Sequence, residues 1–592
     1  MCGIAGCATT DRNLRVPAAI FDALHHRGPD GHGSSEWENG QYSWRLVHTR
    51  LAIVDLSANA SQPMENEDGS LVLAYNGEIY NAPELRRYCE ARGHRFRSKM
   101  DGEVILHLFE MEGTAAFARL NGIFAIALAN KVSGEITLAR DCMGVKPMYF
   151  VENGSDLWFA SEINALKAFG APIGSPDPVA LGQFLTFLWI PEPRTPFESC
   201  KVLLSGQVLQ WRDGVVSKSM FRSIIDEAAA AGDLDETDLI QDAGRILGEA
   251  VKRQMMSDVP VGLMASGGID SSLLWVLAKE GLSKAITIDW RSDDGIESLR
   301  DDTRIVVDLA FRTGTPVDYL PVNLESLQPS PLGGDLFADP AFDLTRSIAR
   351  FAKNEGIKVL LSGHGGDEVF AGYRRHMVAS LIDKFRGKGS PLKIAQHIAS
   401  VAGYPLAAEY LWRLRLAFKE RDEFGAYMQL CTYSTPLERA QALSCTEREM
   451  SNDRMWEQHR KVFDTLPAQW SYLRRVRSLD CKVYLPGLGL AYTDRAGMEY
   501  GVEIRVPWLD PDVVRWGLRL PDRALVHRGR GKVVPRQLAA QLVPEIKRKQ
   551  SKRGFGVPIN MLRVGESRGG EREFRQGTYF AVAKEKLDSF LG

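Results

Sequence analysis

Cysteine is sparse in this sequence and widely scattered. Eight cysteines occur among 592 residues, and none forms a CxxC pair. A disulfide framework and a cysteine-based zinc site both need closely spaced cysteines, so both classes are excluded. We interpret seven of the cysteines as small buried hydrophobic side chains. Cys2 differs because it directly follows the initiator methionine.

The sequence also lacks a large net charge and a long apolar run. Lys and Arg (73) nearly balance Asp and Glu (75), giving a formal charge of −2, so no overall field attracts nucleic acid or anionic membrane. No stretch approaches the roughly 20 apolar residues of a membrane-spanning helix, and MCGIAGC lacks the basic and apolar regions of a signal peptide. We therefore expect a cytoplasmic protein that binds neither nucleic acid nor membrane.

The length and the pattern of apolar residues predict two domains. A chain of 592 residues is too long for one hydrophobic core. Short β-rich runs separated by turns predict a sheet-based domain over residues 1–212, flanked by helices near 83–93 and 102–113. A polar, acidic stretch over 213–240 predicts a linker. Residues 241–592 then begin with strands alternating with helices, which indicates a parallel α/β sheet, and residues 374–499 favour helices.

Cys2 is a candidate nucleophile because of its position. Removal of Met1 would expose the α-amine of Cys2, whose pKa near 8 suits it to take a proton from the thiol. Nucleophile and base would then come from one residue. Position alone is weak evidence, because a random protein has Cys at position 2 on the order of one time in a hundred.

Separated motifs support that assignment: MCGIAG, HRGPDG, HTRLAIVD, YNGEIYN, KMDGEV, LNGIFAIAL, ARDCMGVKP and FASE. Together they resemble the class II glutamine amidotransferase domain of asparagine synthetases, which implies an N-terminal nucleophile αββα sandwich. The resemblance makes Cys2 the glutaminase nucleophile, with Asn76 and Gly77 as oxyanion donors. It implies a glutamine site formed by Arg50, Leu51, Ala52, Ile53, Val54, Asn76, Gly77, Glu78 and Asp101. A guanidinium and two carboxylates suit the opposite charges of a free amino acid. In isolation, NGE would be only a turn and Arg50 only a surface charge.

A second motif, SGGIDSS, follows the apolar run VGLMA and opens a helix. Two glycines let backbone N–H groups approach an anion at a helix N-terminus. GxxxxGK[ST] is absent from the sequence, so this is not a Walker-type loop. The motif resembles the pyrophosphate loop of enzymes that cleave ATP to AMP and pyrophosphate. Without a second motif, a Ser/Gly turn before a helix would be an adequate explanation.

LLSGHGGDEVFAGY supplies that second motif, again as in asparagine synthetases. The resemblance implies that Asp270 and Asp367 share Mg²⁺, a hard cation that prefers oxygen ligands. It places Lys532, four residues before Arg536, at the position of the family's catalytic lysine, where it would neutralise charge on the leaving phosphates. The implied ATP-binding residues are Met264, Ser266, Gly267, Gly268, Asp270, Ser271, Ser272, Ile288, Ser362 and Gly363. The distal segments DRAGMEYGVEIRVPWLD, GKVVPRQ and KRGFGVP resemble the same family.

Three features depart from the family pattern. His364 stands where asparagine synthetases usually have Glu or Asp, and imidazole can act as a base but cannot attract an ammonium as a carboxylate does. The others are the acidic insert RSDDGIESLRDD and Pro535 at a position usually held by an apolar helix former.

The leading hypothesis is ATP-dependent conversion of aspartate to asparagine, with ammonia passing internally from glutamine. His364 motivates an alternative, a specialised amidotransferase with another carboxylate acceptor. A β-lactam-synthetase-like cyclase needs no glutaminase, so Cys2, Asn76 and Asp101 argue against it. A non-catalytic interaction protein would lack the nucleophile or the metal acids, and both are present. The expected partners are glutamine, ATP and a carboxylate acceptor, and the resemblance leaves room for a homodimer.

Overall fold

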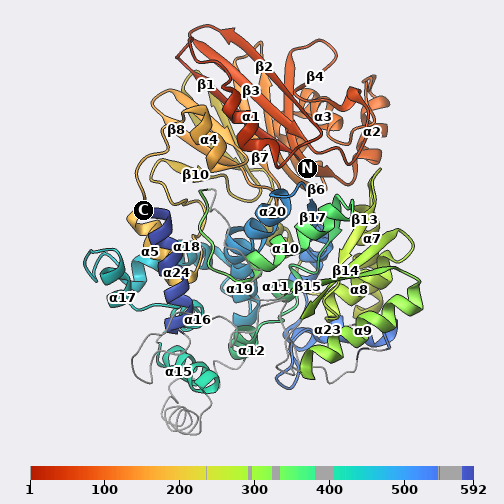
Figure 1. Ribbon diagram of the computed structural model, residues 1–592, viewed down its shortest axis with the longest axis vertical. Helices are drawn as coiled ribbons and strands as arrows, with labels where there is room; N and C mark the ends of the chain where they lie inside the picture. Colours follow the sequence, from red (N-terminus) through yellow and green to blue (C-terminus); the bar gives the residue numbers. More distant parts are fainter. Residues whose placement is uncertain are drawn as a thin grey trace.

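The structure, a computed structural model, describes residues 2–234, 237–290, 297–322, 334–380, 405–420, 422–544, 546 and 576–591. Within these ranges the chain forms two six-stranded antiparallel sheets and one five-stranded parallel sheet. Figure 1 shows the two antiparallel sheets together in the red-to-yellow N-terminal half and the parallel sheet in the green and blue half. The N-terminus lies where the two halves meet.

The antiparallel sheets show the two-residue alternation of half-buried strands. The first sheet has the order β10-β8-β9-β1-β3-β2 and the second β12-β11-β7-β6-β5-β4. Along β1, Ile4 and Ala8 face the space between the sheets, whereas Ala5 and Cys7 face the opposite side. The strands are β1 Gly3–Thr9, β2 Gly31–Asn39, β3 Tyr42–Arg50, β8 Tyr149–Asn153, β9 Asp156–Ala160 and β10 Cys200–Val202, then β4 Met64–Glu65, β5 Leu71–Ile79, β6 Gly122–Asn130, β7 Glu135–Arg140, β11 Gln207–Arg212 and β12 Val215–Met220.

Helices cover the outer faces of both antiparallel sheets. Helices α1 (Ala18–His25) and α4 (Ile163–Phe169) contribute apolar side chains to a cluster with β1. Helices α2 (Ala82–Glu90) and α3 (Glu103–Glu112) do the same with β5. A third cluster fills the space between the sheets. The layers are therefore helix, sheet, sheet, helix, which confirms the predicted αββα class.

The parallel sheet has the order β15-β14-β13-β16-β17. Its strands are β13 Val261–Met264, β14 Leu282–Trp290, β15 Val317–Val322, β16 Val359–Leu361 and β17 Glu503–Arg505, accompanied by α7 Leu239–Gln254, α8 Ile269–Ala278, α9 Glu297–Thr313, α10 Ala341–Asn354 and α23 Val533–Leu542. The strands predicted for VGLMA, AITIDW and KVLLSG are confirmed. The chain leaves β13 toward β14 on one side and later returns to β16 on the other. Such a switch point opens a crevice at the carboxyl ends of the two strands, where ligands bind.

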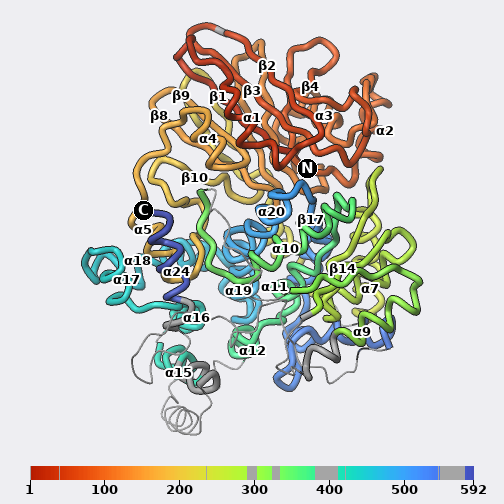
Figure 2. Tube along the Cα trace, in the orientation of Figure 1, coloured from red at the N-terminus to blue at the C-terminus, as the bar shows by residue number. Residues whose placement is uncertain are grey.

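Helices fill most of the remaining C-terminal half, as predicted for residues 374–499 where the structure describes them. They are α11 Gly366–Val369, α12 Arg374–Ala379, α15 Pro405–Lys419, α16 Glu423–Cys431, α17 Pro436–Ala442, α18 Asn452–Thr465, α19 Tyr472–Leu479, the π-helix η4 Asp480–Leu490, α20 Ala491–Met498, α21 Pro511–Leu518 and α22 Asp522–Leu525. The last helix, α24 (Gln576–Leu591), packs its apolar side chains against α5 (Pro178–Phe187) from the N-terminal half (Figure 2). In the described part of the chain, no helix is both long and apolar enough to cross a membrane.

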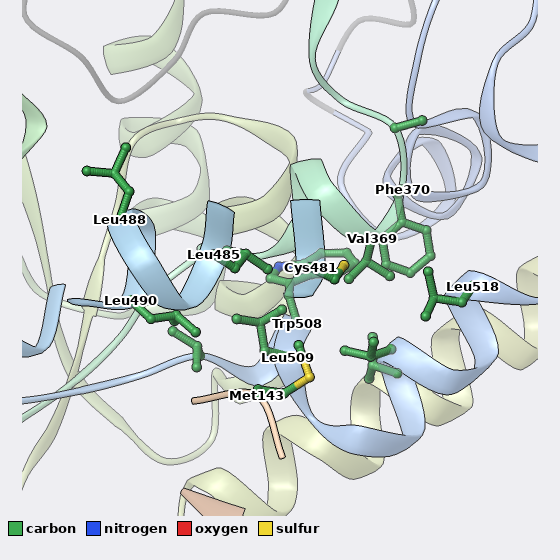
Figure 3. Close-up of a cluster of buried hydrophobic side chains, with 14 of the residues drawn as sticks. Met143, Val369, Phe370, Cys481, Leu485, Leu488, Leu490, Trp508, Leu509 and Leu518 are labelled. Atoms are coloured by element: carbon green, nitrogen blue, oxygen red, sulfur yellow. The ribbon is translucent and has the colours of Figure 1, made fainter. Parts of the chain in front are cut away.

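The segment predicted as a linker is structured at its start. β12 pairs along its whole length with β11: Met220 lies opposite Gln207 at one end of the pair, and Val215 lies opposite Arg212 at the other. Helix α6 follows over Ile224–Ala230. Apolar side chains join the two halves directly. Figure 3 shows Met143, from the N-terminal half, in one cluster with Trp508 and Leu509. This contact area fixes the position of one half against the other.

Candidate active sites

A cavity at the start of β1 brings together most of the predicted glutamine-binding residues. Cys2 lies at one wall, and residues from the end of β3, from β5 and from the segment before α3 form the others. The lining residues are Cys2, Arg50, Leu51, Ile53, Val54, Gln62, Tyr75, Gly77, Glu78, Met100 and Asp101. Of the predicted residues, Ala52 and Asn76 are outside this lining. The Ala52 N–H donates instead to Asp30 Oδ2 over 2.7 Å.

The nitrogen of Cys2 is held by Asn76. The Cys2 N–H donates to Asn76 Oδ1 over 3.0 Å, and the carbonyl oxygen of Cys2 accepts from Arg27 Nε at 3.2 Å. Asn76 Nδ2 is buried and has no hydrogen-bond partner among the described residues. A buried donor without a partner is costly, so it suits an oxygen that gains negative charge. Burial raises the pKa of the Cys2 thiol, which keeps it protonated until a base removes the proton.

Gly77 is required by the packing of two strands. A Cβ at Gly77 would lie 2.0 Å from the carbonyl oxygen of Ile123 on the neighbouring strand β6. Its φ of +151° also lies in a region that L side chains rarely adopt. β5 can therefore pair with β6 at this position only because residue 77 has no side chain.

The charged groups of the cavity are preset by their neighbours. Arg50, at the end of β3, donates to the carbonyl oxygens of Ser57 (2.8 Å) and Asp55, which orders the loop behind it. Burial raises the pKa of Asp101 to about 6, although hydrogen bonds to the carboxylate oppose this rise. Burial, together with the nearby charge of Asp101, also raises the pKa of Glu78. Glu78 Oε2 is buried and makes no hydrogen bond within the described residues, so it can accept one from a ligand ammonium.

Three positioning contacts at this cavity were absent from the sequence predictions. The Tyr75 hydroxyl donates to Asp101 Oδ2 over 2.8 Å, and the Ile79 N–H donates to the same oxygen at 2.5 Å. Arg505, on β17 of the C-terminal half, lies 3.5 Å from Glu78 Oε1. Tyr75 is part of the YNGEIYN motif, so the motif gave a signal, whereas nothing in the sequence paired Arg505 with Glu78.

Buried ion pairs connect the cysteine site to the C-terminal half. Arg27, which is 0% exposed, contacts Glu162 Oε1 at 3.0 Å and Asp494 Oδ2 at 2.9 Å. Lys146 Nζ lies 3.2 Å from the other oxygen of Asp494. Burial opposes ionisation of Asp494, but Arg27 and Lys146 outweigh it and hold its pKa below the usual value. Arg27, Lys146, Glu162 and Asp494 belong to the motifs HRGPDG, ARDCMGVKP, FASE and DRAGMEYGVEIRVPWLD, but the sequence assigns these four residues no individual roles.

The first nucleotide motif forms the predicted strand, turn and helix. β13 ends at Met264 and α8 begins at Ile269, so the glycine turn precedes the helix N-terminus. Gly267 has φ +70°, and the hydroxyls of Ser266 and Ser271 are 2.9 Å apart across the turn. The Ser272 hydroxyl is buried without a hydrogen-bond partner in the described ranges. The turn thus offers polar groups at the N-terminus of α8, where an anion can bind.

The second motif packs directly against the first. A Cβ at Gly363 would lie 3.1 Å from the Cβ of Asp270, and one at Gly366 would lie 2.9 Å from its Cγ. Lys532 Nζ contacts Asp270 and lies 2.6 Å from Asp367 Oδ1. Burial alone would lower the pKa of Lys532, but the two carboxylates outweigh it and raise the pKa above the usual value. The structure therefore brings Lys532 together with both residues predicted to bind the metal.

The remaining predicted ATP-binding residues lie around the same switch point. Gly268 precedes α8, and Ser362 and Gly363 follow β16. Met264, at the end of β13, is buried in an apolar cluster against which Ile288 of β14 packs. Apolar side chains beside a phosphate-binding turn can accommodate a purine ring. Glu368 was not predicted, yet burial and the charge of Asp367 raise its pKa to about 7.

His364 has hydroxyl partners on both ring nitrogens. Nδ1 lies 2.5 Å from Ser362 Oγ, and Nε2 lies 2.9 Å from the hydroxyl of Tyr492. Burial lowers the pKa of His364 to about 4, so the imidazole is neutral near pH 7. A neutral ring in this position provides hydrogen bonds but no charge.

Pro535, another residue that departs from the family pattern, is the third residue of α23. The first four N–H groups of a helix lack an intrahelical partner, so proline is tolerated there. The distal segment KRGFGVP (552–558) lies outside the described residues, as do residues 291–296 of the acidic insert, whose remainder, 297–302, begins α9.

Comparisons with known proteins agree over nearly the whole chain. The family model for the glutamine amidotransferase domain matches residues 1–222, and the one for asparagine synthase matches residues 243–573. A Bacillus subtilis protein named asparagine synthetase [glutamine-hydrolyzing] 1 is 28% identical over 580 residues, covering 94% of this chain and 87% of the relative. A Methanocaldococcus jannaschii protein named putative asparagine synthetase [glutamine-hydrolyzing] 2 is 31% identical, covering 72% of this chain and 87% of the relative.

The likeness to solved structures is much weaker. A structure described as the allosteric regulatory enzyme of purine biosynthesis is 15% identical with a TM-score of 0.30, covering 56% of this chain and 84% of that one. Classification therefore depends on the family models and the sequence relatives. Because the asparagine synthase model alone covers more than half of its residues, the chain belongs to the asparagine synthase family.

Proposed function

We propose that this chain hydrolyses glutamine at Cys2 and uses the released ammonia to amidate aspartate, forming asparagine, glutamate, AMP and pyrophosphate. One observation carries the proposal: the Cys2 nitrogen is fixed by Asn76 in a cavity with Arg50, Glu78 and Asp101. A cysteine with an anchored amine, facing groups of both charge signs, is suited to attack the side-chain amide of a free amino acid.

In the glutaminase step, Arg50 binds the carboxylate of glutamine, and Glu78 and Asp101 bind its ammonium. Once Met1 is removed, the Cys2 α-amine takes the thiol proton, and the sulfur attacks the amide carbon. Asn76 Nδ2 and the Gly77 N–H donate to the oxyanion of the tetrahedral intermediate. The protonated amine then gives its proton to the leaving nitrogen, and ammonia departs from a thioester that water hydrolyses to glutamate.

In the synthetase step, the turn after β13 holds the phosphates of ATP and the acceptor carboxylate attacks the α-phosphorus. A bond forms between the carboxylate oxygen and phosphorus while the bond to pyrophosphate breaks. Lys532 then balances the negative charge that grows on pyrophosphate. Ammonia attacks the acyl carbon, loses a proton and displaces AMP. In this proposal ammonia passes internally from the first site to the second.

The paired carboxylates of Asp270 and Asp367 fit Mg²⁺. They meet at one cation, the Lys532 ammonium, so they converge on a single position without any ligand. Their oxygen donors suit this ion. When bound, Mg²⁺ would neutralise phosphate charge.

The two-site reaction is tested with Cys2→Ala. This variant should lose glutamine-dependent amide formation but keep ammonia-dependent amide formation, measured by mass spectrometry of the products. Equal loss of both activities would contradict separate sites. Mass spectrometry of the intact protein should also show a chain that starts at Cys2, because a retained Met1 blocks the α-amine.

The acceptor is the part of the proposal that His364 affects. A neutral imidazole bound to two hydroxyls cannot attract the ammonium of aspartate by charge. A specialised amidotransferase with a different carboxylate acceptor is therefore the second candidate. A panel of carboxylic acids, assayed with glutamine, ATP and Mg²⁺, separates the two. Efficient turnover of aspartate would refute the second candidate, and turnover of another acid without aspartate would refute the first.

A further inference from the structure

Two histidines and two glutamates converge at the outer edge of the second antiparallel sheet, and none of them lines the glutamine cavity. Glu67 lies between β4 and β5, His94 follows α2, and His107 and Glu110 lie on α3. One ligand atom from each of the four lies within 4.8 Å of all the others. His107 and Glu110 are three positions apart on a helix, so their side chains share one face.

Some of the distances within the cluster are close to those around a small metal ion. His107 Nδ1 lies 3.3 Å from Glu67 Oε2, His94 Nδ1 lies 3.4 Å from Glu67 Oε1, and His94 Nδ1 lies 4.0 Å from Glu110 Oε2. Ligand atoms about 2.0 to 2.1 Å from a tetrahedral zinc ion are roughly 3.3 Å apart. The two shortest separations are close to this value, although they involve different oxygens of Glu67. Because the cluster as a whole is held only within 4.8 Å, the exposed side chains of Glu67 and Glu110 must adjust to close around an ion.

His107 gives a second, independent indication of a ligand. It is 1% exposed, yet neither ring nitrogen makes a hydrogen bond of good geometry within the described residues. Its Nδ1 faces Glu67, while Nε2 lies 3.8 Å from the buried carboxylate of Glu103. A histidine that binds a metal through one ring nitrogen usually faces a carboxylate through the other, and this carboxylate fixes the ring and its tautomer. A bound cation would give Nδ1 of this buried imidazole a well-directed bond in place of its poorly directed contact with Glu67.

A backbone N–H and a side-chain amide hold the carboxylates of Glu67 and Glu110 in place. Glu67 Oε1 accepts from the Arg95 N–H at 3.0 Å, and Glu110 Oε2 accepts from Asn66 Nδ2 at 3.4 Å. Glu103 in turn accepts from the N–H groups of residues 97 and 98, at 2.6 and 2.9 Å. The ligands are therefore supported by bonds that do not depend on a metal.

We propose that Glu67, His94, His107 and Glu110 bind a zinc ion that ties the β4–β5 connection and the segment after α2 to α3. Imidazole nitrogens with carboxylate oxygens suit zinc, whereas Mg²⁺ prefers oxygen ligands alone. The site is structural, because its four protein ligands fill the tetrahedral positions.

The test uses the full-length protein without a histidine tag. After incubation with zinc and dialysis, metal analysis should find one zinc ion per chain. The variants His107→Ala and His94→Ala should each lose the zinc ion. Because His94 is more exposed than His107, His94→Ala should remain folded even if His107→Ala does not. His25→Ala, a change of the same type at an exposed helix end, should keep the ion. Wild-type protein without stoichiometric zinc would overturn the proposal.

Cobalt(II) distinguishes this site from binding at cysteine. Substituted protein should show the visible absorption of tetrahedral cobalt without the near-ultraviolet band of a cobalt–thiolate bond. A thiolate band would overturn the proposal, since it would place the ion at a cysteine. Glu103→Gln should weaken zinc binding by about 10- to 100-fold, because the His107 ring loses the carboxylate that orients it. Zinc should raise the melting temperature of the unmodified protein. This rise should disappear in His94→Ala and persist in His25→Ala.

Discussion

Replacing Tyr75 with phenylalanine should shift the pH dependence of glutamine hydrolysis. The Tyr75 hydroxyl donates to Asp101, whose pKa is raised to about 6 by burial. A hydrogen bond to a charged group contributes about 1.5 to 3 kcal/mol, and 1.36 kcal/mol corresponds to about one pKa unit. Without the hydroxyl, the pKa of Asp101 should rise by at least about one unit, to roughly 7 or above.

The activity change follows from the ionised fraction of Asp101, since only the carboxylate attracts the ammonium of glutamine. A rise in pKa from about 6 to about 7 lowers that fraction about twofold at pH 7 and about fivefold at pH 6. The acid limb of kcat/KM should move upward by the same unit, measured as glutamate release from about pH 5.5 to about pH 8.5.

Tyr80→Phe is the matched control for this prediction. The Tyr80 hydroxyl is buried but has no hydrogen-bond partner in the part of the chain that the structure describes. Its removal should leave the acid limb in place, and ammonia-dependent amide formation should be unchanged in both variants. An unmoved acid limb in Tyr75→Phe would refute the role given to its hydroxyl.

Lys532→Met should reduce amide formation by about 10²- to 10³-fold while glutaminase activity remains, measured as pyrophosphate and glutamate release; a parallel loss of both would argue against its placement in the synthetase site. Asp494→Asn should lower the free energy of unfolding by about 3 kcal/mol at neutral pH, because Arg27 and Lys146 lose their shared counter-charge; urea unfolding measures this, and an unchanged midpoint would contradict it. In the unmodified protein this stabilisation should be complete above about pH 4, the unfolded pKa, and disappear as the pH falls through the depressed folded pKa. Gly77→Ala should abolish glutaminase activity, because its Cβ would lie 2.0 Å from a carbonyl oxygen on β6; activity within a fewfold of the unmodified enzyme would show that the strands can separate.

Sequence motifs predicted the parts of the structure that depend on a few neighbouring residues. SGGIDSS lies between a strand and a helix as predicted, because a glycine turn before a helix is encoded within a few residues. The fold class was also predictable, since alternation in β-rich runs and strand–helix succession are properties of short windows. The family pattern placed Lys532 beside Asp270 and Asp367, although they are far apart in the chain.

Contacts between distant segments could not be predicted from such windows. The approach of Arg505 to Glu78 depends on how two sheets from different halves are placed, and no local pattern encodes that placement. Arg27 and Asp494 are charged residues of two separate motifs. Their ion pair could not be predicted, because it forms only where the fold buries both side chains together. β12 was hidden for another reason: its side chains are mostly exposed, and its apolar residues, at the two ends, do not alternate with polar ones as in a typical half-buried strand.

The buried contacts of Arg27 have a consequence for protein engineering. One side chain holds the carbonyl of Cys2 and, through Asp494, helix α20 of the other half. A chimera that joined this glutaminase half to a synthetase half from a relative would keep every catalytic group and could still misplace the nucleophile. The exchangeable unit is therefore larger than the amidotransferase segment itself. It must carry the partner surface of α20 and β17, with Asp494 and Arg505, or the transplanted cysteine will lose the support that positions it.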